Sequence, residues 1–587
     1  MFKILKRMKK REWLYFILTV ALITMQVWVD LKLPEYMGSI TELLQVPGKG
    51  MNDILQEGGK MAGLAFLSVL ISILIAMFAA RIATNLSSRL RDDLFNKVQS
   101  FTLHEINQFS IPSLITRTTN DITQVQMLIV IGMQILVKSP IMAVWAITKI
   151  LDKSWQWSMA TGIAVITLIL VSVIVIGFAI PKFKVLQKQT DDLSRVSREN
   201  LTGLRVVRAY NAEKYQESKF EKTNLAFTKT NLFANRLMAA LMPSVELINN
   251  GLILSVYWLG ALLISNAVGM RQLELFSDMM VFSSYALQLL MAFMMLVMVL
   301  ILIPRASVSA QRIGEVLDTK PTIKDGRMTV KYAPNPGEIE FKHVSFKYPD
   351  AQDYVLQDIT FKANKGETIA LIGAIGCGKS TVIDLIPRFY EATEGEITIG
   401  GVNIKDYKQA SLRDKIGYVS QKAILFKGSV ASNVSFGSNG TRGIGTDRIE
   451  EAIETSQSQD FVSKMDKSIK SYIAPGGANL SGGQKQRLSI ARAIARNPEI
   501  LIFDDSFSAL DYKTDKLLRK ELRRQAADAT IVIVAQRIGT IKDADKIIVL
   551  DQGKIAGIGK HKDLLKNCSV YQEIAYSQLS KEELENE

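Results

Sequence analysis

Cysteine is scarce in this sequence: among 587 residues only Cys377 and Cys568 are cysteines. Both lie in the second half of the chain, in a polar context, so the sequence indicates no disulfide framework. The sequence also lacks the pattern of a cleavable leader, because its first apolar run is of spanning length and is not followed by a small-residue cleavage site. A small disulfide-stabilised secreted protein is therefore excluded.

The apolar residues are abundant but unevenly spread. The chain is longer than a typical single domain, and 48% of its residues are hydrophobic. Up to about Ser307 they form long runs, whereas beyond it charged residues, glycines and short β-rich segments alternate with helical patterns. The proline-containing stretch 332–337 marks a boundary, so we predict domains at residues 1–318 and 337–587, joined by a linker at 319–336.

Six apolar runs in the first domain are long enough to cross a bilayer core of roughly 30 Å as helices. They are residues 13–33, 61–83, 125–149, 155–181, 237–265 and 279–304. The formal net charge of +14 does not require a nucleic-acid partner, because the basic residues gather at the N-terminus and after the second and fourth runs. The positive-inside rule places those segments, the N-terminus and the second domain in the cytosol. We expect a multi-pass protein of the lipid bilayer, with Trp28, Trp155 and Trp157 as interfacial anchors.

Two long polar segments separate the second from the third run and the fourth from the fifth. Both are rich in helix formers with regularly spaced apolar positions, and each is interrupted once, near Pro112 and near Gly203, as a turn at a helix tip requires. Solvated helical hairpins are one interpretation. We favour hairpins that contact the second domain, because their apolar faces need a partner.

The stretch LIGAIGCGKST at residues 371–381 has the pattern of a P-loop. A short apolar strand precedes three glycines that allow consecutive backbone N–H groups to converge on one anion, namely Gly373, Gly376 and Gly378. Lys379 follows at the spacing that reaches the outer phosphates of a nucleotide, and Ser380 places a hydroxyl where Mg²⁺ would bind. A helix is expected to begin here, with its positive end toward the phosphates.

Further elements of a nucleotide site follow along the chain. The apolar run at 500–503 ends in Asp504 and Asp505, which is typical of a buried strand that presents a Mg²⁺-side carboxylate and a second acid near the attacking water. The sequence NLSGGQKQR opens a helix whose backbone amides form another anion site. Gln421 lies in a loop between the phosphate elements, and an apolar strand ends at Gln536.

These motifs together resemble one half-transporter of the ATP-binding cassette (ABC) exporter superfamily, over nearly the whole chain. The resemblance implies six membrane helices with long cytosolic extensions, followed by an α/β P-loop domain that binds ATP and Mg²⁺. It implies roles for Tyr348 in adenine stacking, for Ser380, Gln421 and Asp504 around Mg²⁺, and for segments 109–116 and 209–215 as coupling helices. The remaining implied nucleotide-binding residues are Gly373, Gly376, Gly378, Lys379, Thr381, the signature Leu480, Ser481, Gly482, Gly483 and Gln484, and Asp511 of the D-loop.

Two positions depart from the family pattern. The general base after the Walker B acid is glutamate in the family and Asp505 here, and the switch histidine is replaced by Gln536. Aspartate withdraws the carboxylate by about 1.5 Å, and such a displacement can cost about 10²-fold in rate. Loss of a transition-state donor typically costs about 10²- to 10³-fold. We therefore expect ATP binding with very slow hydrolysis at this chain's own site.

Domains of this kind are similar to those that dimerise head to tail, with each ATP between one P-loop and the opposite signature. An intact signature beside an impaired P-loop site favours a second, non-identical half-transporter as partner. The resemblance is to the degenerate-site subunit of bacterial heterodimeric multidrug exporters in the cell membrane. Other functions remain open at this point. They are a homodimeric exporter, a lipid or peptide translocator, an importer with an exporter fold, and an ATP-gated regulatory or channel-like subunit.

The sequence says less about the transported compound than about the nucleotide site. Four methionines recur at helical spacing on the last run, namely Met291, Met294, Met295 and Met298. They form a polarizable stripe that suits either a cavity for hydrophobic or amphipathic compounds or ordinary helix packing. Glu246 and Lys138 are ionisable groups within apolar runs and are not expected to face lipid; Glu246 could attract a cation or pair with another group.

Overall fold

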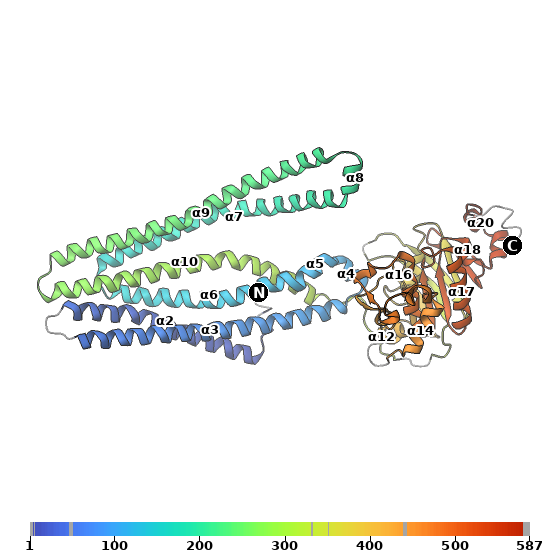
Figure 1. Cartoon of the computed structure of the whole chain (residues 1–587), viewed down its shortest axis with the longest axis horizontal. Coiled ribbons are helices and arrows are strands. Elements are labelled where there is room, and N and C mark those ends of the chain that lie inside the picture. Colours follow the sequence, from blue (N-terminus) through green and yellow to red (C-terminus); the bar gives the residue numbers. More distant parts are fainter. Residues whose placement is uncertain are drawn as a thin grey trace. The chain divides into compact units, whose positions relative to one another are not determined.

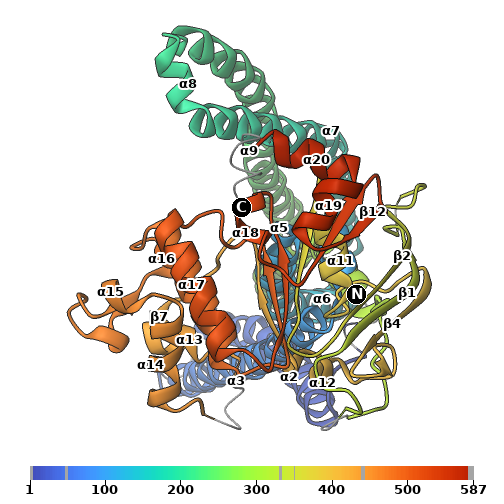
Figure 2. The same cartoon turned by 90° about the vertical axis from the view of Figure 1, so that its right-hand side faces the viewer.

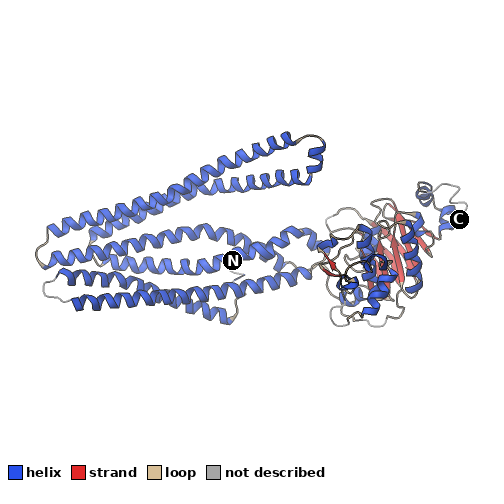
Figure 3. Ribbon diagram, in the orientation of Figure 1, coloured by secondary structure: helices blue, strands red, loops and turns tan. Residues whose placement is uncertain are grey.

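The chain folds into two compact units. The computed structural model describes residues 4, 6–45, 51–329, 333–349, 351–437 and 443–578. The first unit comprises Met1–Gln99 and Ile111–Thr319, and the second comprises Ser100–Ser110 and Lys320–Glu587. Strands occur only in the second of these units among the described residues, as Figure 3 shows. We call them the membrane unit and the nucleotide unit.

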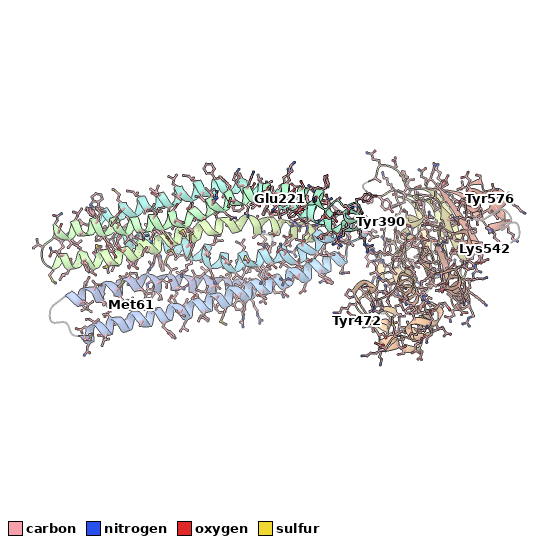
Figure 4. All side chains as sticks on the ribbon, turned by 45° about the horizontal axis from the view of Figure 1, so that its top comes forward. Met61, Glu221, Tyr390, Tyr472, Lys542 and Tyr576 are labelled. Atoms are coloured by element: carbon pink, nitrogen blue, oxygen red, sulfur yellow. The ribbon has the colours of Figure 1, made fainter. Side chains whose placement is uncertain are left out.

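Six long helices form the membrane unit. They are α2 (Lys10–Gln45), α3 (Met51–Gln99), α6 (Ile122–Leu151), α7 (Trp155–Thr202), α9 (Glu213–Ser265) and α10 (Met270–Asp318). Each contains an apolar stretch long enough to cross a bilayer, so the six predicted membrane helices are confirmed. Several continue well past the predicted runs, α3 to Gln99 and α7 to Thr202, which produces the expected long extensions. Figure 4 labels Met61 on α3 and Glu221 on α9.

Helices α7 and α9 form a long hairpin, closed by the short helix α8 (Leu204–Ala209), and its closed end projects away from the other helices in Figure 1. The opposite end packs against α10. Trp157 is fully buried there, with its ring 5.4 Å from that of Phe282. The expectation that Trp157 is an interfacial anchor is therefore wrong, since it fills the core, whereas Trp28 and Trp155 are exposed.

Ion pairs connect several membrane helices. The Nζ of Lys138 on α6 lies 3.0 Å from Oδ2 of Asp30 on α2, and Ser68 of α3 donates to Oδ1 of the same carboxylate at 2.6 Å. Glu35, one and a half turns further along α2, pairs with Lys149 at 2.8 Å. As predicted, Lys138 is turned toward the protein interior, where a carboxylate compensates its charge.

The first cytosolic turn differs from the prediction. Its tip is the short helix α4 (Leu103–Phe109), after which Ser110 has a φ of 61°, a value that L-residues seldom adopt. Segment 109–116 therefore spans a chain reversal and α5 (Ile111–Thr116) rather than one helix, because Pro112 lies in the first turn of α5, where proline is tolerated. A π-helical turn, η1 (Arg117–Asp121), then leads into α6.

The second turn also differs. Segment 209–215 contains the last residue of α8, a turn and the first residues of α9, so the helix at this tip is α8 itself. Gly203 separates α7 from α8, as the sequence predicted.

A six-stranded sheet organises the nucleotide unit. Its strand order is β12 (Lys554–Gly559), β11 (Lys546–Asp551), β3 (Thr368–Gly373), β10 (Thr530–Val534), β9 (Ile500–Asp504) and β6 (Ile416–Val419), parallel except for β12. An antiparallel sheet has the order β2 (Leu356–Ala363), β1 (Ile339–Phe346), β4 (Glu394–Ile399) and β5 (Val402–Asn403). A small two-stranded pair joins β7 (Gly428–Ser429) and β8 (Tyr472–Ile473).

Two apolar cores hold this unit together, one formed by the larger sheet with most of the helices and one by both sheets with α11. Besides α4, the α-helices of the unit are α11 (Lys379–Leu385), α12 (Gln409–Asp414), α13 (Val430–Val434), α14 (Thr446–Thr455), α15 (Gln459–Val462), α16 (Gly482–Ala495), α17 (Tyr512–Gln525), α18 (Ile538–Ile541), α19 (His561–Asn567) and α20 (Ser569–Tyr576). Helices α13 to α16 lie on the side of the unit opposite β1, β2 and β4 in Figure 2.

Candidate nucleotide site

The loop between β3 and α11 has the shape of a phosphate cradle. A Cβ on Gly373 would lie 2.1 Å from the carbonyl oxygen of Leu550, and one on Gly378, whose φ is 99°, would lie 2.6 Å from Leu356. Neither position accepts a side chain. Gly376 has a φ of 86° and faces open space, so the backbone of the loop can approach an anion closely.

The residues after the loop supply groups suited to Mg²⁺ and phosphate. The Nζ of Lys379 donates to the carbonyl oxygens of Gly373 and Ala374, both at 2.8 Å, which holds the ammonium across the loop. The hydroxyl of Ser380 lies 3.4 Å from a carboxylate oxygen of Asp504. Mg²⁺ prefers oxygen ligands such as a hydroxyl and a carboxylate. The residues present therefore suit Mg²⁺ bound together with a nucleoside triphosphate.

Parallel strands bring the remaining predicted residues to one edge. Asp504 ends β9, Gln421 follows β6 and Gln536 follows β10, and the carboxyl ends of these strands lie side by side with that of β3. Burial raises the pKa of Asp504, and the neighbouring charge of Asp505 raises it further. Such a pair of carboxylates favours a nearby cation.

Asp505 is held by two amide side chains. The Nε2 of Gln536 donates to its Oδ2 at 3.0 Å, and the Nε2 of Gln421 lies 3.5 Å from the same oxygen. The backbone N–H of Asp505 donates to the carbonyl of Val534 at 2.9 Å, which fixes this turn to the neighbouring strand. Asp505 and Gln536 are therefore hydrogen-bonded to each other.

The signature segment begins a helix with a well-formed cap. Ser481 is the N-cap of α16, where its hydroxyl accepts from the N–H of Gln484 and the Gln484 side chain accepts from the N–H of Ser481 at 2.9 Å. A Cβ on Gly483 would lie 3.3 Å from the carbonyl oxygen of Ala509, next to the D-loop. Asp511 caps α17 by accepting from the N–H of Thr514.

Comparison with known proteins agrees with this geometry. Residues 16–305 match the ABC transporter transmembrane region, and residues 356–508 match the ABC transporter family. This chain belongs to the ABC transporter family. It is 35% identical to an uncharacterised ABC transporter ATP-binding protein of Mycobacterium tuberculosis, across 95% of this chain and 96% of that protein. It is 31% identical to an ATP-dependent lipid A-core flippase of Pseudomonas fluorescens, across 84% of this chain and 80% of that protein.

A solved structure of an ABC exporter also has this fold. A bacterial Atm1-family ABC exporter with ATP bound superposes with a TM-score of 0.78 at 24% identity, over 97% of this chain and 99% of that one. The protein is thus a multi-pass membrane protein with the ABC exporter fold and a cytosolic ABC ATP-binding domain.

In this ABC domain the predicted adenine-stacking residue lies beside the P-loop helix. The hydroxyls of Tyr348 and Thr381 are 3.1 Å apart. The Tyr348 ring meets those of Phe346 and Tyr390 edge-on, with centroids 5.0 and 5.1 Å away, and Tyr390 is labelled in Figure 4. These contacts fix the ring next to the phosphate loop.

A functional neighbour that the sequence reasoning missed is Asp384. It lies one turn after Ser380 on α11, and the hydroxyl of Tyr418 donates to its Oδ1 at 3.2 Å. Burial raises the pKa of Asp384 to about 6, and the charge of Asp504 adds to the effect although the Tyr418 hydrogen bond opposes it. The spacing of four residues from Ser380 is the signal that could have revealed it.

The residues predicted to contact the transported compound occupy different surroundings in the ABC membrane unit. Met291 and Met295 are exposed on α10, whereas Met294 packs against the core of the unit. The side chain of Met298 lies outside the described residues. Glu246 is exposed on α9. The methionine stripe is therefore divided between packing and an exposed face.

Proposed function

We propose that this chain is one subunit of a heterodimeric ABC exporter and that its own P-loop site holds ATP while hardly hydrolysing it. The observation that carries the proposal is the hydrogen bond between Gln536 and Asp505, 3.0 Å long. It engages one of the two carboxylate oxygens at the position of the general base and so competes with a water molecule for that carboxylate. It also occupies the amide that would otherwise face a γ-phosphate.

The parts that bind nucleotide are in place around this pair. The contacts of Lys379 with the loop and of Ser380 with Asp504 support binding of ATP with Mg²⁺, which would neutralise phosphate charge there. The two departures from the family pattern noted in the sequence, Asp505 and Gln536, both fall on positions that serve the hydrolytic step. A site that binds and does not turn over suits a regulatory role, in which bound ATP favours closure of the paired domains.

The partner is proposed from the signature. The capping box of Ser481 and Gln484 presents the N-terminus of α16 in good order, so this chain can complete the ATP site of another subunit. A non-identical half-transporter with glutamate after its Walker B acid and a switch histidine would supply the working site. Hydrolysis there would reset the exporter after alternating access.

The cargo is proposed to be hydrophobic or amphipathic compounds. Two flexible methionines, Met291 and Met295, and the carboxylate of Glu246 are exposed on the membrane unit. Such side chains can adapt to ligands of different shapes and can attract a cationic group.

Two measurements test the proposal on the full-length chain in lipid nanodiscs. Fluorescent trinitrophenyl-ATP with Mg²⁺ should bind, and a Lys379→Ala variant should bind at least tenfold more weakly. Steady-state ATP turnover of the chain without a second subunit should be about 10²-fold or more below that of a competent ABC ATPase. Brisk turnover by the chain alone would show that the site is competent and overturn the heterodimer.

Lipid translocation is the second candidate, because relatives at about one-third identity are named ATP-dependent lipid A-core flippases. Proteoliposomes separate the two functions. ATP-dependent movement of a fluorescent cationic dye without movement of a fluorescent phospholipid supports drug-like export, and the reverse result supports a flippase. The chain must be reconstituted with its partner in both assays.

A further inference from the structure

Helix α4 belongs to the nucleotide unit, and a buried carboxylate connects it to the segment after α10. Glu105, only 1% exposed, lies in the first turn of α4 and accepts hydrogen bonds on both oxygens. The N–H of Thr102 donates to Oε2 at 2.7 Å, and the N–H of Thr322 donates to Oε1 at 2.9 Å. The hydroxyl of each threonine donates to the same oxygen as its N–H. Burial alone raises the pKa of Glu105, but these hydrogen bonds outweigh it and hold the pKa below its usual range.

The two threonines come from different parts of the sequence. Thr102 is the residue that caps α4, and its contacts with Glu105 are those of an ordinary capping box. Thr322 is 217 residues away, in the segment that follows α10. Capping α4 therefore explains one half of the carboxylate's bonds, and the other half connects α4 to the segment after the last membrane helix.

That segment is fixed to the body of the nucleotide unit. The N–H groups of Gly326 and Met328 donate to the carbonyls of Tyr407 and Asp406, at 3.1 and 2.9 Å. The carboxylate of Asp325 accepts from the N–H of Gln409 at 2.6 Å. Thr322 therefore lies three residues before the first of these anchored residues, Asp325. A group that binds Thr322 is expected to move together with the body of the nucleotide unit.

Arg388 connects the same segment to the P-loop helix. It lies three residues beyond the end of α11 and is 3% exposed. Its Nη2 donates to the carbonyl of Lys324 at 3.0 Å, and its guanidinium also pairs with Glu391. A continuous set of contacts thus runs from the P-loop helix through Arg388 and the segment of Thr322 to Glu105 and α4.

Both ends of α4 continue into the membrane unit, through Gln99 to α3 and through Ser110 to α5. We propose that Glu105 and Thr322 form a clamp that makes α4 follow the P-loop helix of its own chain and pass its displacement to α3 and α5. Glu105 is thus a positioning residue of the transport cycle. The inference holds for an ABC transporter of any subunit composition and does not depend on the degenerate site.

Two matched variants separate a clamp from a simple helix cap. Thr322→Val and Thr102→Val each remove one hydroxyl from the same carboxylate at almost constant shape, but only the first weakens the tie to the distant segment. Thr322→Ser keeps both donors and serves as the conservative control. A lost hydrogen bond to a buried charge is large enough to change local opening by about tenfold or more.

Hydrogen–deuterium exchange of the full-length transporter in nanodiscs provides the test, with and without Mg²⁺ and the non-hydrolysable analogue AMP-PNP. In the native protein AMP-PNP should change exchange in peptides covering 371–385 and 100–110. In Thr322→Val the response of 371–385 should persist, while basal exchange of 100–110 should rise about tenfold and its nucleotide response should be lost. Thr102→Val should raise basal exchange yet keep the response, and Thr322→Ser should behave as the native chain.

Two results would overturn the clamp. One is a Thr322→Val protein whose 100–110 peptides exchange like the native ones without nucleotide. The other is a native protein in which AMP-PNP protects 371–385 and leaves 100–110 unchanged. A failure of ATP binding, which would contradict the proposed function instead, is detected separately by trinitrophenyl-ATP in the same samples.

Discussion

On the proposed function, changing Asp505 and Gln536 to the family's glutamate and histidine should give rapid hydrolysis only when both are changed together. The perturbation is Asp505→Glu with Gln536→His, made singly and in combination in the full-length chain. The longer side chain returns the carboxylate toward the attacking water, and the imidazole supplies the missing donor at the γ-phosphate. Binding of ATP should change little, because Lys379, Ser380 and Asp504 are untouched.

The magnitude follows from the geometry. Moving a carboxylate by about 1.5 Å accounts for about 10²-fold, and a transition-state donor for about 10²- to 10³-fold, which together correspond to about 5–7 kcal/mol of barrier if the effects are independent. They are not independent here, since Gln536 donates to Asp505 at 3.0 Å. In the single Asp505→Glu variant the amide still engages the carboxylate, so we expect a gain of only about tenfold. The double variant should exceed the product of the two single gains.

The assay is steady-state phosphate release at saturating Mg²⁺ and ATP, with the chain alone in nanodiscs. Two copies can complete each other's sites, because each carries its own ordered signature. The triple variant with Lys379→Ala is the control and should lose the gain entirely. The reasoning is refuted if Asp505→Glu alone gives the full increase, or if the double variant binds ATP, forms dimers and is no faster than the native chain.

Three further predictions concern stability. Because the folded chain raises the pKa of Asp384 to about 6, its stabilising contribution is present below about pH 4 and is lost as pH rises through 6. Asp384→Asn should therefore raise the free energy of unfolding of the nucleotide unit by about 2 kcal/mol at pH 8 and leave it unchanged at pH 4. Thermal melts at the two pH values measure this difference. An equal effect at both pH values would contradict the prediction. Arg492→Met should lower the free energy of unfolding by about 3 kcal/mol, since the half-buried guanidinium donates to the carbonyl and the side-chain oxygen of Asn433 at 2.9 and 3.0 Å, and Arg492→Lys should cost less. Asp30→Asn should lower the melting temperature by leaving Lys138 uncompensated, and adding Lys138→Met should recover most of the loss; no recovery would argue against their pairing.

The sequence was sufficient for the features that depend on local pattern. Apolar runs of spanning length predicted the six membrane helices, and the alternation of strands and helices predicted the α/β domain. The edge at which Asp504 and Gln421 meet follows from a parallel sheet, so the grouping of these residues could be predicted from their positions after strands. Each of these inferences needs only periodicity and a rule of topology.

The remainder depends on tertiary contacts that no pattern encodes. Trp157 looked like an interfacial residue because its position in the sequence is next to a helix end, but the neighbouring helix α10 covers it completely. The helix at the first cytosolic tip ends at Phe109, earlier than the predicted segment 109–116, because Pro112 lies in the first turn of α5 and does not mark the tip. The bond of Glu105 to Thr322 joins residues 217 positions apart, and their sequence contains no sign of it.

The geometry of Asp505 and Gln536 bears on how this ATP site should be understood. A site that had simply lost its activity could have changed at any of its residues, and an unpaired buried carboxylate would then be a cost to folding. Here the carboxylate that replaced the base is satisfied by the amide that replaced the switch histidine, with Gln421 nearby at 3.5 Å. On the proposed function, this hydrogen bond keeps the edge of the sheet ordered and holds both side chains away from the hydrolytic step. The same proposal leaves the loop, Ser380 and Asp504 to bind ATP with Mg²⁺, so a retained nucleotide would report its presence to α4 through the Glu105 clamp without being consumed.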